Sequence, residues 1–183
     1  MRKLIMWNVA TLDGYFEGKE KWDLSFHDSI WGPEVEKFGH EQLRSADYIV
    51  FGRVTYEGMA DYWKKAEGET ARLMNSIPKI VFSKTLKEAD WQNTTLINED
   101  ASTAIARLKA EGNGEMYVFG SADLSQTLIN HDLFDEYRIV VAPVILGNGT
   151  PLFKPGTSSR NLSLLSSQPL TTGGVILRFG KKE

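Results

Sequence analysis

The chain has 183 residues, of which 42% are hydrophobic and 25% charged, and its formal net charge is −3. This composition is typical of one globular domain over residues 1–183, and the absence of a dense basic run argues against a nucleic-acid partner. The lack of cysteine excludes disulfides, thiolate nucleophiles and iron–sulfur centres, and the three histidines do not share metal-ligand spacing, so no metal is expected.

The first predicted element is a strand over residues 3–10, which is apolar and ends at the turn sequence Thr11-Leu12-Asp13-Gly14. Its apolar run is too short for the core of a signal peptide, and no later run is long enough to cross a bilayer. Together with the lack of cysteine, these features predict a cytoplasmic protein that makes no membrane contact.

Strand and helix patterns alternate through the middle of the chain. After a loop over residues 16–32, Pro33 opens a helix that is expected to include Ala46. A further helix is expected over residues 102–111, with Ser102 as its N-cap and Gly112 as its stop. Other helices are expected after Arg53, over 69–76 and around 124–129. Short apolar runs predict strands over 48–51, 79–82, 94–97 and 116–119.

The last third of the chain predicts mainly strands. Residues 136–146 indicate a long strand that Pro143 interrupts, which favours an edge position or a bulge. Alternating residues over 162–170 and 175–179 flank the turn over 171–174 and predict a hairpin. We therefore expect a three-layer mixed α/β fold, with a mostly parallel sheet, helices on both faces and a C-terminal antiparallel hairpin.

Three turns that follow predicted strands could bind phosphate. Glycines allow close approach to the backbone, helix N-termini offer free N–H groups, and cations and hydroxyls add contacts. Three such turns on one sheet edge suit a dinucleotide, although the Rossmann and Walker A signatures are absent. The turns are Gly52-Arg53-Val54-Thr55, Ser83-Lys84-Thr85 and Gly120-Ser121-Ala122.

The order of these and other motifs resembles that of the dihydrofolate-reductase-like superfamily. Within it, the chain is most similar to the C-terminal reductase domain of the riboflavin-biosynthesis deaminase-reductase, the RibD C-terminal domain family, and the resemblance spans residues 3–179. The motifs, in chain order, are Thr11–Gly14, Gly52–Glu57, Phe82–Lys84, Val118–Ala122, Leu133–Glu136 and Pro143–Phe153.

The resemblance implies that NADPH is the cofactor. The turns after the strands would hold its phosphates, the turn at Ser83 and Lys84 would meet the adenosine 2′-phosphate, and the end of the first strand would meet the nicotinamide amide. Ser121 stands where the family usually has a second glycine. The implied cofactor residues are Val9, Ala10, Gly52, Arg53, Thr55, Ser83, Lys84, Gly120, Ser121 and Ala122.

Three carboxylates are candidates for the catalytic acid. Asp13 is the leading candidate, because the resemblance matches its turn to a Ser-Leu-Asp-Gly turn of the riboflavin-pathway relatives, with Thr11 in place of serine. Trp31-Gly32-Pro33-Glu34 is similar to the segment in which dihydrofolate reductases place their carboxylate, so Glu34 or Glu36 could serve instead. Acidic residues in a first helical turn also complement the helix dipole without any catalytic role.

The resemblance implies an NADPH-dependent reductase of a small molecule. The favoured reaction reduces 5-amino-6-(5-phosphoribosylamino)uracil in riboflavin biosynthesis, and the alternatives are reduction of dihydrofolate or another pterin and a non-catalytic nucleotide-binding module. A homodimer is also expected, because relatives commonly dimerise and the segment Pro143–Phe153 is rich in apolar residues.

Overall fold

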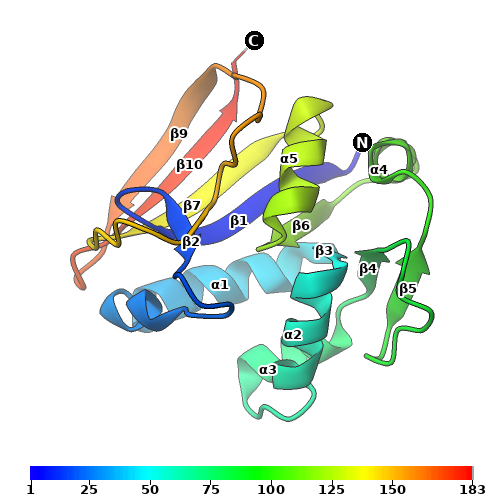
Figure 1. Cartoon of the computed structure of the whole chain (residues 1–183), viewed down its shortest axis with the longest axis horizontal. Coiled ribbons are helices and arrows are strands. Elements are labelled where there is room, and N and C mark those ends of the chain that lie inside the picture. The colour runs from blue at the N-terminus through cyan, green and yellow to red at the C-terminus, as the bar shows by residue number, and fades with distance from the viewer. Residues whose placement is uncertain (183) are drawn as a thin grey trace.

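An eight-stranded sheet runs through the computed structural model, which describes residues 1–182 (Figure 1). The strand order is β5-β4-β3-β6-β1-β7-β10-β9. Pairing is parallel from β5 to β7, whereas β10 is antiparallel to both β7 and β9. The strands are β1 (Lys3–Thr11), β3 (Ala46–Gly52), β4 (Lys79–Phe82), β5 (Thr94–Ile97), β6 (Glu115–Phe119), β7 (Glu136–Ala142), β9 (Leu162–Pro169) and β10 (Val175–Lys181).

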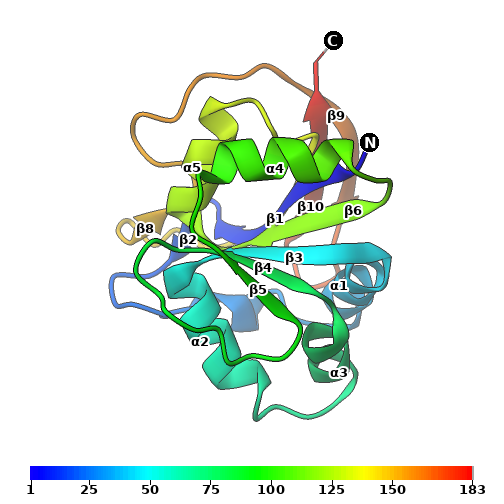
Figure 2. The ribbon, with the colours of Figure 1, turned by 90° about the vertical axis from the view of Figure 1, so that its right-hand side faces the viewer.

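Helices cover both faces of the sheet, as Figure 2 shows. On one face lie α1 (Pro33–Ser45), α2 (Arg53–Trp63) and α3 (Glu69–Ser76), and on the other lie α4 (Ala101–Ala110) and α5 (Ala122–Asn130). The predicted three-layer α/β fold with a C-terminal hairpin is thus confirmed. Within residues 1–182, no helix combines the length and the apolar character needed to cross a membrane.

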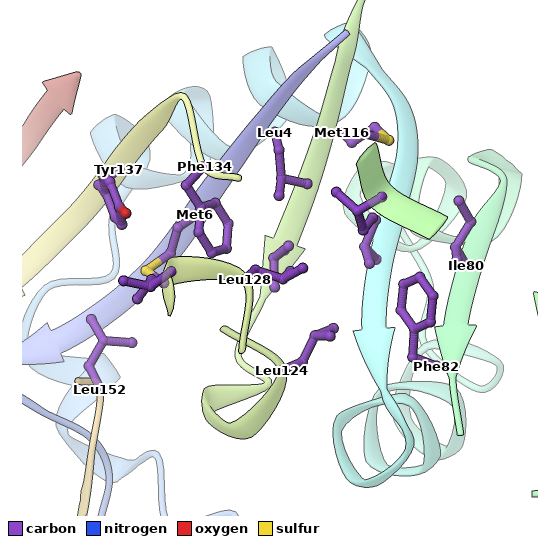
Figure 3. Packing of buried hydrophobic residues seen from close by; sticks show 14 of the residues in the cluster. Leu4, Met6, Ile80, Phe82, Met116, Leu124, Leu128, Phe134, Tyr137 and Leu152 are labelled. Atoms are coloured by element: carbon purple, nitrogen blue, oxygen red, sulfur yellow. The ribbon is translucent and has the colours of Figure 1, made fainter. Parts of the chain in front are cut away.

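The core follows the alternation of side chains along the strands. Leu4 and Met6 of β1 point toward α4 and α5 and pack with Leu128 and Phe134 (Figure 3). Ile5 points the other way, into a second cluster with residues of α1, α2 and α3. Because both faces of β1 are covered, its sequence is a continuous apolar run rather than an alternating one.

A second, two-stranded sheet pairs β2 (Tyr15–Glu17) with β8 (Thr150–Pro151). A short 3₁₀ helix, η1 (Ser25–Ser29), follows β2. The pattern of residues 16–32 had predicted only a loop, because strands of two or three residues have no readable periodicity. This small sheet holds the loop after β1 against the segment after β7.

Three details of the predicted elements are wrong. β7 hydrogen-bonds to β1 and β10 as far as Ala142 and is internal; Pro143, which has no backbone N–H, follows its end. Ala46 is extended and pairs with Glu115, so it begins β3 rather than continuing α1. The N-cap of α4 is Asp100, which accepts from the Thr103 N–H, and not Ser102.

Candidate active site

A cavity of about 410 Å³, here called the strand-end cavity, lies where β1, β3 and β6 end. Its walls come from these strand ends, from the first turns of α2 and α5, and from the segment after β2. It therefore collects turns that are far apart in the sequence. The predicted cofactor residues that line it are Val9, Gly52, Arg53, Thr55, Gly120, Ser121 and Ala122.

The first turns of α2 and α5 both open on the strand-end cavity. Neither helix has a side-chain cap within the described residues. The first N–H groups of a helix have no intrahelical partner and carry the positive end of its dipole. Two such ends at one cavity form a site that suits two linked phosphates.

Hydrogen bonds connect the two turns to each other. The Gly52 N–H donates to Ser121 Oγ at 3.0 Å, and the Ser121 N–H donates to Thr55 Oγ1 at 3.0 Å. Ser121 has a φ of 55°, a left-handed conformation that favours glycine. Its hydroxyl thus offers a contact that the second glycine of the family could not make, and it fixes the distance between the two turns.

Asn8 adds a further contact that sequence reasoning missed. Its Oδ1 accepts from the Gly120 N–H at 2.7 Å, and the residue is buried against the strand-end cavity. Its Nδ2 has no hydrogen-bond partner among residues 1–182. The sequence could have identified Asn8, because it is the one polar residue in the apolar run from Leu4 to Ala10. A buried amide usually has a specific hydrogen-bond partner.

One edge of β1 is free beside the cavity. The pairing of β1 with β6 ends at Trp7 and Phe119, whereas its pairing with β7 continues to Thr11. Val9 lines the strand-end cavity, and Ala10 is buried in the core next to it. The end of β1 can therefore offer backbone groups to a ligand on the side that β6 leaves open.

Ser83 and Lys84 do not line the strand-end cavity. They follow β4, whose last residue Phe82 pairs with Gly52, so their turn is next to the Gly52 turn along the sheet edge. Ser83 Oγ accepts from the N–H groups of Thr85 and Leu86 at 3.1 and 2.9 Å, whereas Lys84 is exposed. Lys84 is thus the exposed cation of this turn.

Asp13 holds two segments together. Its carboxylate accepts from the Thr11 hydroxyl at 2.6 Å and from the N–H groups of Leu146 and Gly147 at 3.2 and 2.8 Å. The Thr11 hydroxyl and these backbone donors lower the pKa of Asp13, which keeps it ionised. It does not line the strand-end cavity.

The two candidate glutamates of α1, Glu34 and Glu36, have different surroundings. Glu34 accepts from the Thr171 hydroxyl at 2.5 Å and from its N–H at 2.8 Å, contacts that lower its pKa and join α1 to the turn after β9. Glu36 is exposed and lies 4.0 Å from His40 Nε2. Asp13 and Glu34 do not line the strand-end cavity or a second cavity nearby, whereas Glu36 lines the second one.

That second cavity, here called the helix-side cavity, has a volume of about 100 Å³ and lies among α1, α2, α3 and the sheet. It shares three lining residues, Trp7, Met59 and Phe119, with the strand-end cavity. The Trp7 and Phe119 rings meet edge to face, with centroids 5.1 Å apart. These three side chains therefore form a wall that the two cavities share.

A sequence model of the RibD C-terminal domain family matches residues 2–176. The chain belongs to this family. YyaP of Bacillus subtilis strain 168, an uncharacterized protein, is 31% identical over 95% of this chain and 92% of its own length.

Solved structures share the fold of this RibD C-terminal domain. A Shewanella sp. PV-4 protein whose description places it provisionally in riboflavin biosynthesis is 25% identical, with a TM-score of 0.83 over 99% of both chains. Dihydrofolate reductase from Enterococcus faecalis, solved with NADP(H), is 15% identical, with a TM-score of 0.67 over 99% of this chain and 97% of its own.

In this RibD-family domain, residues 17–24 cover part of the strand-end cavity. The Trp22 N–H donates to Glu17 Oε1 at 2.6 Å, and Thr150 holds the other carboxylate oxygen of Glu17 at 3.0 Å. The Trp22 ring lies against Gly58 of α2 so closely that a Cβ on Gly58 would be 2.0 Å from Trp22 Cζ2. Gly58 is thus the docking point of this loop.

Gly58→Ala is expected to displace Trp22 and open the loop over residues 17–24. The added methyl group cannot occupy the space of the ring, so the loop loses its contact with α2. Trypsin cleavage after Lys19 or Lys21 should become about tenfold faster. This factor corresponds to a decrease of ~1.4 kcal/mol in the free energy of opening the loop. Gly39→Ala is the control, because a Cβ there meets no atom within 4 Å. Equal cleavage rates for Gly58→Ala and Gly39→Ala would contradict the packing of Trp22 on Gly58.

His27 also lines the strand-end cavity, and its Nε2 is buried without a partner among the described residues. Burial lowers the pKa of His27 from 6.5 to about 4, against a smaller opposing effect of Asp28. Because the unfolded chain binds this proton more readily, the contribution of His27 to stability is present above pH 6.5 and is lost as the pH falls toward 4.

We therefore expect His27→Gln to lose less stability on acidification than the wild type does. The wild type should lose up to about 3 kcal/mol more between about pH 7 and pH 4, which is the linkage of a shift of this size. Urea unfolding at both pH values measures the difference. Parallel losses in the two proteins would show that His27 titrates normally.

Proposed function

We propose that the protein is an NADPH-dependent reductase that transfers a hydride to a small heterocyclic substrate. The observation that carries this proposal is the convergence of the uncapped N-termini of α2 and α5 on the strand-end cavity. That arrangement suits a pyrophosphate. Membership of the RibD C-terminal domain family supports the same activity.

The residues around the strand-end cavity fit NADPH. The first turns of α2 and α5 would bind the pyrophosphate, Arg53 would pair with a phosphate oxygen, and Lys84 on the neighbouring turn would meet the 2′-phosphate. The free edge of β1 at Val9 and the unpaired amide of Asn8 would hold the nicotinamide amide. When bound, the cofactor supplies the hydride, and the chain aligns it and excludes water.

We assign Glu36 as the carboxylate that faces the substrate, because it lines the helix-side cavity, whereas Asp13 and Glu34 line neither cavity described above. Asp13 and Glu34 are then positioning residues. Asp13 holds the loop at Leu146, and Glu34 fixes α1 to Thr171. A carboxyl group next to the reacting carbon could deliver the proton that accompanies hydride transfer.

The proposal is tested by following NADPH oxidation with two substrates, 5-amino-6-(5-phosphoribosylamino)uracil and dihydrofolate. We expect oxidation with at least one of them, and a product that has gained two hydrogens by mass spectrometry. Glu36→Gln should lower kcat with unchanged NADPH affinity, whereas Glu41→Gln on the same helix should change neither. NADPH binding without turnover on any reducible heterocycle would favour a nucleotide-binding module instead.

A further inference from the structure

Another cavity, here called the basic cavity, lies at the opposite end of the sheet from the strand-end cavity. Its volume is about 410 Å³, and its walls come from the start of β7, the start of β9, the end of β10 and the segments next to them. Because β7 is parallel to β1, its start is far from the strand ends that border the strand-end cavity. Figure 1 shows these parts of the sheet beside the end of α5 and the C-terminus. Among the described residues, the basic cavity shares no lining residue with the two cavities above.

Positive charge exceeds negative charge around the basic cavity. Within residues 1–182, the charged side chains that line it are Arg160, Lys181 and Lys182 against Asp132. Three positive charges and one negative charge leave an excess of two, whereas the whole chain has a net charge of −3. A phosphate monoester carries a charge of about −1.5 to −2 near neutral pH. The local charge therefore complements a phosphate group.

Two of these cations face one exposed carboxylate. Asp132 lies 3.5 Å from Arg160 Nε and 3.1 Å from Lys181 Nζ, and its side chain is 58% exposed. The Arg160 guanidinium also donates to the carbonyl oxygens of Ile129 and Asn130 at 3.1 and 3.3 Å, which hold it at the end of α5. Exposed ion pairs contribute little free energy. An anion in the basic cavity can therefore compete with Asp132 for both cations.

Tyr137 offers a buried hydrogen-bond donor to the basic cavity. The residue is 5% exposed, and its ring packs beside Phe134 with the ring centroids 5.5 Å apart (Figure 3). Tyr137 lines the basic cavity, and its hydroxyl has no hydrogen-bond partner within residues 1–182. Burial raises the pKa of Tyr137 to about 12, so the hydroxyl keeps its proton and can donate at neutral pH. Because polar groups of buried side chains usually have a partner, this hydroxyl indicates a ligand that accepts a hydrogen bond.

We propose that the basic cavity binds a small organic phosphate. The phosphate group would accept from the Tyr137 hydroxyl and pair with Arg160 and Lys181, and the organic part would lie against Leu162. A cavity of this volume suits a small molecule. The proposal does not depend on the reductase activity, because the two sites lie at opposite ends of the sheet.

Phenyl phosphate and phenol test the class of ligand, because they differ only by the phosphate group. In isothermal titration calorimetry, we expect phenyl phosphate to bind in a saturable way. Phenol should bind at least about tenfold more weakly, a difference of ~1.4 kcal/mol, because it lacks the charge that the cations pair with. Equal affinity for the two compounds, or no binding of phenyl phosphate, would overturn the proposal.

Tyr137→Phe tests the buried donor. It removes one hydroxyl and keeps the ring, so the affinity for phenyl phosphate should fall about tenfold. The melting temperature without ligand should not fall, because the hydroxyl has no partner within the described part of the chain. Tyr48→Phe is the matched control, because Tyr48 is also partly buried in this core cluster but lines none of the three cavities. Unchanged phenyl phosphate affinity in Tyr137→Phe would overturn the proposal.

Two further variants distinguish the basic cavity from the strand-end cavity. Lys181→Gln should weaken phenyl phosphate binding about tenfold and leave NADPH affinity unchanged, whereas Lys37→Gln, which changes an exposed lysine on α1, should alter neither. Arg53→Ala should retain the phenyl phosphate site that Lys181→Gln weakens. Loss of phenyl phosphate binding in Arg53→Ala but not in Lys181→Gln would place the phosphate in the strand-end cavity, which would overturn this proposal and leave the proposed function standing.

Discussion

Replacing Arg138 by methionine is expected to lower the free energy of unfolding by about 3–5 kcal/mol. The Arg138 guanidinium is buried beneath α1 and donates to Glu136 at 2.8 and 3.1 Å, to Gln42 Oε1 at 3.0 Å and to the Tyr117 hydroxyl at 2.8 Å. Without it, the buried carboxylate of Glu136 keeps, among the described residues, only Arg178, at 2.7 Å. Gln42 Oε1 loses its partner, whereas the Tyr117 hydroxyl still donates to Glu115 Oε2 at 2.6 Å. A buried carboxylate and a buried amide oxygen that have lost their partner are the costly outcome.

Urea unfolding at about pH 7 measures this effect. Arg107→Met is the control, because its ion pairs with Glu99 and Glu111 are exposed and should contribute little. If both variants unfold at the same urea concentration as the wild type, the network around Arg138 is not a source of stability. Arg138 lines none of the cavities described above, so it is not a candidate for binding a substrate phosphate.

Replacing Arg53 by alanine is expected to weaken NADPH binding about 10- to 150-fold, or ~1.5–3 kcal/mol. Arg53 begins α2, lines the strand-end cavity and, among residues 1–182, pairs only with Glu57, at 3.1 Å. An exposed pair of this kind contributes little, so a phosphate can replace Glu57 as the partner of the guanidinium.

The same titration with NADH separates the roles of the two cations. Arg53→Ala should weaken both cofactors, because both carry the pyrophosphate. Lys84→Ala should weaken NADPH alone, because only NADPH carries the 2′-phosphate. Isothermal titration calorimetry gives each dissociation constant. Unchanged affinity in Arg53→Ala would remove Arg53 from the binding site.

Local patterns predicted most of the fold. Buried parallel strands such as β3 and β6 are short apolar runs that end in glycine, and the helices that follow them start next to those glycines. Because the carboxyl ends of parallel strands share one sheet edge, the three turns that could bind phosphate were expected together, and two of them line one cavity. The ends of buried parallel strands can thus be predicted from a single sequence.

Contacts between distant segments could not be predicted in this way. The pairing of β2 with β8, the packing of Trp22 on Gly58 and the bonds from Asp13 to Leu146 and Gly147 each join residues that no local pattern connects. The sequence predicted a turn at Asp13-Gly14, but it did not show which N–H groups donate hydrogen bonds to the Asp13 carboxylate. The catalytic acid and the homodimer stay predictions for the same reason.

The central claim is that the strand-end cavity binds NADPH, and the most direct test is a titration of the wild-type protein with NADPH, followed by nicotinamide fluorescence. The structure predicts saturable binding of one NADPH per chain. NADH should bind more weakly, because it has no 2′-phosphate to pair with Lys84. Absence of saturation by either nucleotide would contradict the assignment of the α2 and α5 N-termini as a pyrophosphate site.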